Sequence, residues 1–69
     1  MTKRHDIHIT DRDRVLRAWQ NSTELVRDYQ AYARETDTGE LGRLFSEYAE
    51  TEALHASTLL EILHGFEQR

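Results

Sequence analysis

The chain has 69 residues, 38% of them hydrophobic, and no cysteine, so neither disulfides nor thiolate zinc sites can stabilise this one small domain. Self-association, helped by a metal ion, is the remaining route to a sufficient core. Charge is uneven, because residues 1–34 hold seven Lys/Arg and five Asp/Glu whereas residues 35–69 hold two and eight, which argues against nucleic acid as a partner.

Apolar runs are at most three residues long and the chain starts with polar residues, so the sequence predicts neither a membrane span nor a signal peptide. We expect a soluble, cytoplasmic protein. The acidic second half would suit metal cations or a basic surface, although a solvated helix face explains most of its carboxylates equally well.

Residues 1–10 should form a polar tail, followed by a helix from about 11 to 36. Thr10 and Asp13 resemble a capping box with aspartate in place of glutamate. Apolar residues then recur at helical spacing, namely Val15, Ala18, Trp19, Val26, Tyr29 and Ala33.

A second helix should run from about 39 to 64, after a turn with Asp37 as N-cap and Glu40 at N3. Gly65 is expected to end this helix, so residues 65–69 should form a tail. Apolar residues continue on one face: Leu41, Leu44, Phe45, Tyr48, Leu59, Ile62 and Leu63. Because the connection is short, the helices should be antiparallel neighbours. The expected fold class is all-α, a helical hairpin that dimerises into a four-helix bundle. The sequence does not determine whether such dimers assemble into a larger ring.

Glu52 and His55 stand three residues apart on the apolar face of the 39–64 helix. Helical geometry places Glu52 within about 20° and His55 within about 45° of the centre of that face. A buried carboxylate is costly unless it is paired, and a metal ion is the usual partner of such a pair. The alternative is that Glu52 and His55 hydrogen-bond to a tyrosine or to a dimer mate.

Ser22 occupies the centre of the apolar face of the 11–36 helix, at the level of His55 in an antiparallel hairpin. We expect either a close helix contact or a hydroxyl bonded to its own backbone. Glu24 points about 150° away from that centre and is a poor candidate for the core.

The stretch Leu44–Ala56, together with Tyr29, Tyr32 and Ala33, resembles one half of a ferritin-like di-iron bundle. It is similar to the rubrerythrin pattern and to the compact encapsulated ferritins, which use a single helical hairpin per subunit. The resemblance covers residues 15 to 64 and rests mainly on Glu-x-x-His at the centre of an apolar stripe.

This resemblance implies an iron site between subunits and ferroxidase activity, the oxidation of ferrous to ferric iron. Glu52 would bridge two metals, His55 would bind one of them, and Tyr29 would lie nearby. Zinc and manganese suit carboxylate and imidazole ligands as well. The implied partners are further copies of the chain and an encapsulating shell protein, although the 66–69 tail is unlike an apolar shell-targeting peptide.

Ser22 departs from the family pattern, which calls for a glutamate at this position. The symmetric pair would then offer two Glu52 and two His55, a set that suits one tetrahedral metal, zinc or a single iron, better than a di-iron centre. The resemblance implies at most an outer site for incoming cations at Glu24. Tyr48, one turn before Glu52, is expected in the core, in an interface or beside the ligands.

Three interpretations stay open at this stage. The chain is an iron-handling enzyme, a metal-stapled structural dimer, or an interaction module whose buried polar pair sets helix register and partner choice.

Overall fold

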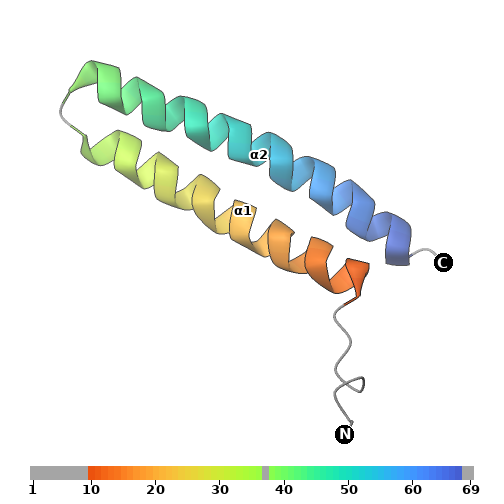
Figure 1. Ribbon diagram of the computed structural model, residues 1–69. Coiled ribbons are helices and arrows are strands. Elements are labelled where there is room, and N and C mark those ends of the chain that lie inside the picture. The colour runs from red at the N-terminus through yellow and green to blue at the C-terminus, as the bar shows by residue number, and fades with distance from the viewer. Residues whose placement is uncertain (1–9, 37, 68–69) are drawn as a thin grey trace, which may run out of the picture.

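The computed structural model describes residues 10–36 and 38–67, which form two helices joined by a short turn. Helix α1 spans Asp11–Glu35 and helix α2 spans Gly39–Glu67. The two run antiparallel and pack along their length (Figure 1). The all-α hairpin expected from the sequence is therefore confirmed. Neither helix combines the length and apolar character needed to span a membrane, as far as the described residues extend.

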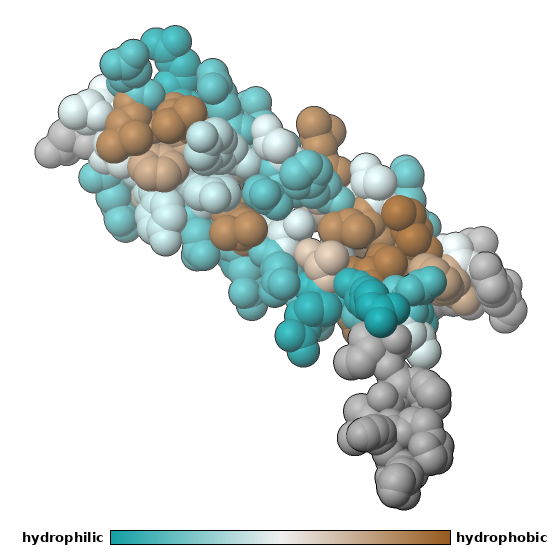
Figure 2. Space-filling model, in the orientation of Figure 1, coloured by the Kyte–Doolittle hydropathy of each residue, from teal (hydrophilic) through white to brown (hydrophobic). Residues whose placement is uncertain are grey.

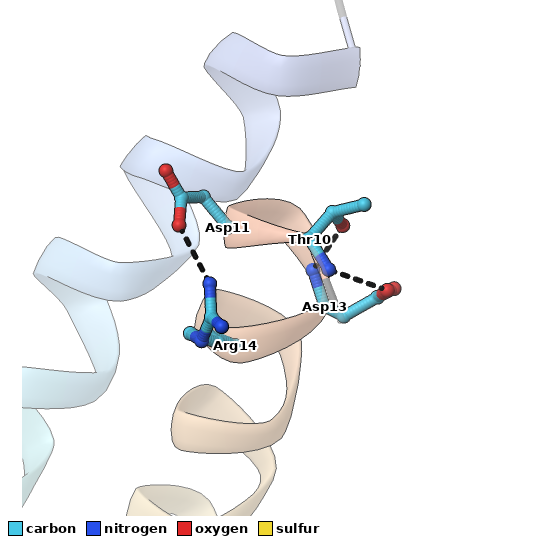
Figure 3. A network of polar contacts seen from close by, with 4 residues as sticks. All are labelled: Thr10, Asp11, Asp13 and Arg14. Carbon is cyan, nitrogen blue, oxygen red and sulfur yellow. Dashed lines mark hydrogen bonds and ion pairs between the residues drawn. The ribbon is translucent and has the colours of Figure 1, made fainter. Parts of the chain in front are cut away.

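Helix α1 begins at the capping box that the sequence indicates. The backbone N–H of Asp13 donates to Thr10 Oγ1 at 3.1 Å, and the N–H of Thr10 donates to Asp13 Oδ2 at 3.2 Å (Figure 3). Arg14 Nη1 lies 3.0 Å from Asp11 Oδ1 on the exposed side of the same turn. The hydrogen bonds from Thr10 hold the pKa of the Asp13 carboxyl below its ordinary value. Thr36, with extended backbone angles, ends the helix.

Helix α2 begins at Gly39, where the N–H of Gly42 donates to the carbonyl of Thr38 at 2.9 Å. The predicted N-cap, Asp37, lies outside the described residues. The helix continues to Glu67, three residues beyond the end expected at 64. Gly65 does not stop it, because none of the described glycines has the positive φ of a left-handed C-terminal cap. Residues 65–67 thus belong to the helix and not to a tail, while 1–9 and 68–69 lie outside the described residues.

The core between the two helices is thin. Of the described residues, only three are buried: Ser22, Ala49 and Leu63. No large side chain in the described part of the chain is fully enclosed. A hairpin with so little buried surface has few contacts of its own to oppose the entropy of unfolding.

An aromatic cluster joins the helices in the half nearer the turn. The Tyr29 ring lies 6.1 Å from that of Phe45 and 5.5 Å from that of Tyr48, centroid to centroid. Tyr32 makes an edge contact with Phe45 at 5.4 Å. These contacts fix the register of the hairpin, because they place Tyr29 between residues 45 and 48.

Much of the apolar surface of α2 is left exposed by the described part of the chain. Figure 2 shows apolar side chains gathered in two groups, one near the turn and one near the open end. Four residues form what we call the exposed stripe: Leu41, Leu44, Tyr48 and Ile62, which are 38% to 46% exposed. Leu41, Tyr48, His55 and Ile62 follow one another at intervals of seven residues. Such a repeat keeps side chains on one seam of a helix, so His55 lies in the middle of the stripe.

Candidate metal site

Glu52 and His55 lie on adjacent turns of α2, where residues three apart are neighbours. Nδ1 of His55 is 3.5 Å from Oε1 of Glu52. The Glu52 side chain is only 20% exposed, whereas that of His55 is 58% exposed. The pair therefore presents one oxygen-donor and one nitrogen-donor group at the border between the helix contact and the exposed stripe.

The position of His55 differs from the core position that the apolar periodicity predicts. The side of α2 that faces α1 runs through Ala49, Ala56 and Leu63. At about 100° per residue, Glu52 is turned about 40° and His55 about 100° from that line. The apolar face of α2 is wider than a single helix can cover, so α1 shelters Glu52 and leaves His55 outside.

Two tyrosines flank Glu52. Tyr29 of α1 and Tyr48 of α2, with Thr51, line a depression of about 220 Å³ beside the Glu52 carboxylate. Thr51 Oγ1 donates to the carbonyl of Glu47 at 3.1 Å and so is engaged with its own helix. The structure thus gathers three of the residues singled out from the sequence, Glu52, Tyr29 and Tyr48, around one small opening.

Ser22 lies in the helix contact at the level of the Glu52–His55 pair. Tyr29 contacts Phe45 and Tyr48. Because the helices are antiparallel, a residue nearer the start of α1 lies beside a residue nearer the end of α2. Seven residues before Tyr29 is Ser22, and seven residues after 45 and 48 are Glu52 and His55. The serine is 8% exposed.

The Ser22 hydroxyl does not bond to its own backbone, in contrast to one of the two expectations from the sequence. Thr23, Thr36 and Thr51 each donate to the carbonyl four residues earlier. For Ser22 no such bond forms, and no other hydrogen-bond partner occurs among residues 10–36 and 38–67. A buried hydroxyl without a hydrogen-bond partner is costly and uncommon, so the burial of Ser22 requires an explanation.

Glu24 is not part of this arrangement. It is exposed and lies beside Arg17, Thr23 and Arg27 on another side of α1. The sequence-based conclusion that Glu24 is a poor candidate for the core agrees with this placement.

The donors among the described residues of one chain do not make a complete metal site. No group of three His, Asp or Glu side chains placed to share a metal ion occurs in the part of the chain that the structure describes. Glu52 and His55 supply two donors of types that iron, zinc and manganese accept. Two donors alone do not fill the coordination shell of such an ion.

The exposed stripe is the feature that periodicity alone assigns wrongly. A helical wheel places Leu41, Tyr48 and Ile62 on one broad apolar face directed at the first helix, but all three are more than two-fifths exposed. Spacing does not separate them, because Ala49, Ala56 and Leu63, which follow the contact with α1, also recur at intervals of seven. The available signal is side-chain size, since the line that faces α1 carries the small residues Ala49 and Ala56.

Comparison of the chain with models of protein families, with curated proteins and with solved structures found no match.

Proposed function

We propose that this chain is a ferritin-like metal-binding protein that pairs with a second copy of itself and binds iron at the interface through Glu52 and His55. One observation carries the proposal: a carboxylate and an imidazole lie 3.5 Å apart at the border between the helix contact and an exposed apolar stripe, with the imidazole in the stripe itself. A partner that covers the stripe also covers the pair, and a covered charged group requires compensation, which a metal ion supplies.

The thin core supports pairing between two copies. A second hairpin that lies along the exposed stripe would bury Leu41, Leu44 and Ile62 and form a four-helix bundle. In a dimer with two-fold symmetry, the exposed stripe of one chain packs against the same stripe of the other chain. Antiparallel pairing of the α2 helices about an axis near residues 52–55 would bring two glutamates and two histidines together.

The surroundings of Glu52 suit a metal ligand. The Glu52 side chain is only 20% exposed, and the rings of Tyr29 and Tyr48 line the depression beside it. Iron, when bound, would supply one-electron chemistry with oxygen or peroxide, which is the chemistry of the ferroxidase activity that the resemblance implies. The chain itself holds the ion in place through Glu52 and His55 and limits the space beside it.

A second function is favoured by the same 3.5 Å contact. Because Glu52 and His55 approach closely enough to pair with each other, they could be satisfied without a metal. The chain would then be a structural dimer in which the polar pair sets helix register, as single buried polar residues do in coiled coils.

Anaerobic iron loading followed by exposure to oxygen separates these functions. The wild-type protein, loaded with ferrous iron and desalted, should retain iron, and the Glu52→Gln and His55→Ala variants should lose it. Glu50→Gln is the matched control, because Glu50 is an exposed carboxylate on the same helix. Ferric absorbance that develops faster than in a protein-free solution supports ferroxidase activity, and equal iron retention in His55→Ala would contradict the metal proposal.

A further inference from the structure

We infer that two chains hold a single metal ion through two Glu52 and two His55 side chains, and that the Ser22 hydroxyl of each chain positions Glu52 for this role. The inference rests on the proposed function and states how the site is completed. It concerns the stoichiometry of the site and a residue that does not touch the metal.

The number of ligands argues for one ion. The described part of each chain brings together only two metal-binding groups, Glu52 and His55. A symmetric pair doubles these to four, two carboxylates and two imidazoles. Four such ligands complete a tetrahedral site for a divalent ion, while a two-metal centre requires further carboxylates to bridge and to balance its charge. At Ser22, level with the ligands, α1 contributes a hydroxyl and not a carboxylate.

Ser22 provides the hydrogen-bond donor that a bound Glu52 requires. One oxygen of Glu52 already faces Nδ1 of His55. Ligating carboxylates are themselves hydrogen-bonded in metal sites, and these bonds fix their orientation. The Thr51 hydroxyl is already engaged with the carbonyl of Glu47, whereas the Ser22 hydroxyl is buried, faces the contact between the helices at the right level, and has no partner in the described chain.

The competing donors are the hydroxyls of Tyr29 and Tyr48, which line the depression beside Glu52. Both tyrosines reach solvent, Tyr48 to 46%, so water can satisfy their hydroxyls. Ser22, which is 8% exposed, has much less access to solvent. For this reason we assign the positioning role to Ser22, and Tyr29→Phe is the variant that tests the assignment.

Zinc and ferrous iron, each titrated alone into metal-free protein, give the stoichiometry. We expect one ion per two chains for either metal. Ser22→Ala should keep this ratio and weaken zinc binding by 10-fold to 100-fold, the usual effect of losing a group that orients a ligand. Thr23→Ala, which removes the adjacent hydroxyl that donates to the carbonyl of Trp19, is the matched control and should leave the affinity unchanged.

The thermal stability of the metal-free protein distinguishes positioning from packing. Removal of a hydroxyl that has no partner should leave the midpoint of metal-free Ser22→Ala unchanged or raise it, although zinc binding weakens. A lower midpoint with unchanged zinc affinity would overturn the positioning role, as would weaker binding in Tyr29→Phe but not in Ser22→Ala. Ser22→Glu should raise the ratio toward two ions per pair.

The outcomes also separate this inference from the proposed function. One ion per chain, or two per pair in the wild-type protein, overturns the single shared site but leaves metal binding at Glu52 and His55 in place. No binding of either metal overturns both.

Discussion

Removal of apolar surface from the exposed stripe should weaken the proposed self-association in a measurable way. Leu44 is 38% exposed and Ile62 is 45% exposed, and both would be covered by a second hairpin. Complete burial of an aliphatic side chain contributes about 1.5–3 kcal/mol. The exposed fractions of these two residues, counted in both chains and allowing for the methyl groups that alanine retains, contribute about 3 kcal/mol. The double variant Leu44→Ala/Ile62→Ala should therefore raise the dissociation constant of the pair roughly 100-fold.

Sedimentation equilibrium over a range of concentrations gives this dissociation constant. Circular dichroism at a concentration where the variant still pairs checks that the hairpin has folded. Leu54→Ala is the control, because Leu54 is the most exposed of the large apolar residues, at 70%, yet is turned about 100° from the centre of the stripe. An unchanged dissociation constant in the double variant, or an equal loss of pairing in Leu54→Ala, would refute the assignment of the interface.

Three further predictions concern the ligands, the end of α2 and the start of α1. His55→Ala should remove bound zinc and iron, as determined by elemental analysis after dialysis, and retention of metal at the wild-type ratio would count against the site. Gly65→Ala should stabilise the protein by about 0.5–1 kcal/mol in thermal denaturation, because Gly65 is helical and a Cβ there meets nothing within 4 Å; destabilisation would mean that α2 ends earlier. The Asp13 carboxyl should titrate below 3.8 in a carbon-detected NMR experiment, since its pKa is lowered by the hydrogen bonds with Thr10. Its stabilising contribution is therefore complete above the ordinary aspartate pKa and is lost as the pH falls through the lower folded value, and an Asp13 pKa at or above 3.8 would be inconsistent with the capping box.

The features fixed by local chemistry could be predicted from the sequence. Thr10 and Asp13 form a capping box whatever the rest of the chain does, because both hydrogen bonds lie within one turn. The position of Ser22 in the helix contact also follows from local periodicity, since an antiparallel hairpin with a short turn has only one register that matches the apolar faces. The end of α2 could not be predicted in this way, because a glycine ends a helix only when it adopts a positive φ, and Gly65 does not.

The exposure of His55 depends on tertiary packing and could not be read from periodicity. The apolar face of α2 is broad, and its centre does not coincide with the line that α1 covers. Ala49 and Ala56 have small side chains that allow α1 to approach that side of the helix closely, so the larger residues on the adjacent seam stay outside. A helical wheel gives the direction of the apolar face. Side-chain volume decides which part of that face packs on α1, the line through Ala49 and Ala56 or the exposed stripe.

Native mass spectrometry of the protein after zinc loading and removal of excess metal tests the central claim most directly, because it reports chain number and metal content together. We predict a species of two chains with one zinc ion, and a return to metal-free chains in His55→Ala. A monomer that carries its own zinc, or a pair that binds none, would contradict the proposal that Glu52 and His55 of two chains share one ion.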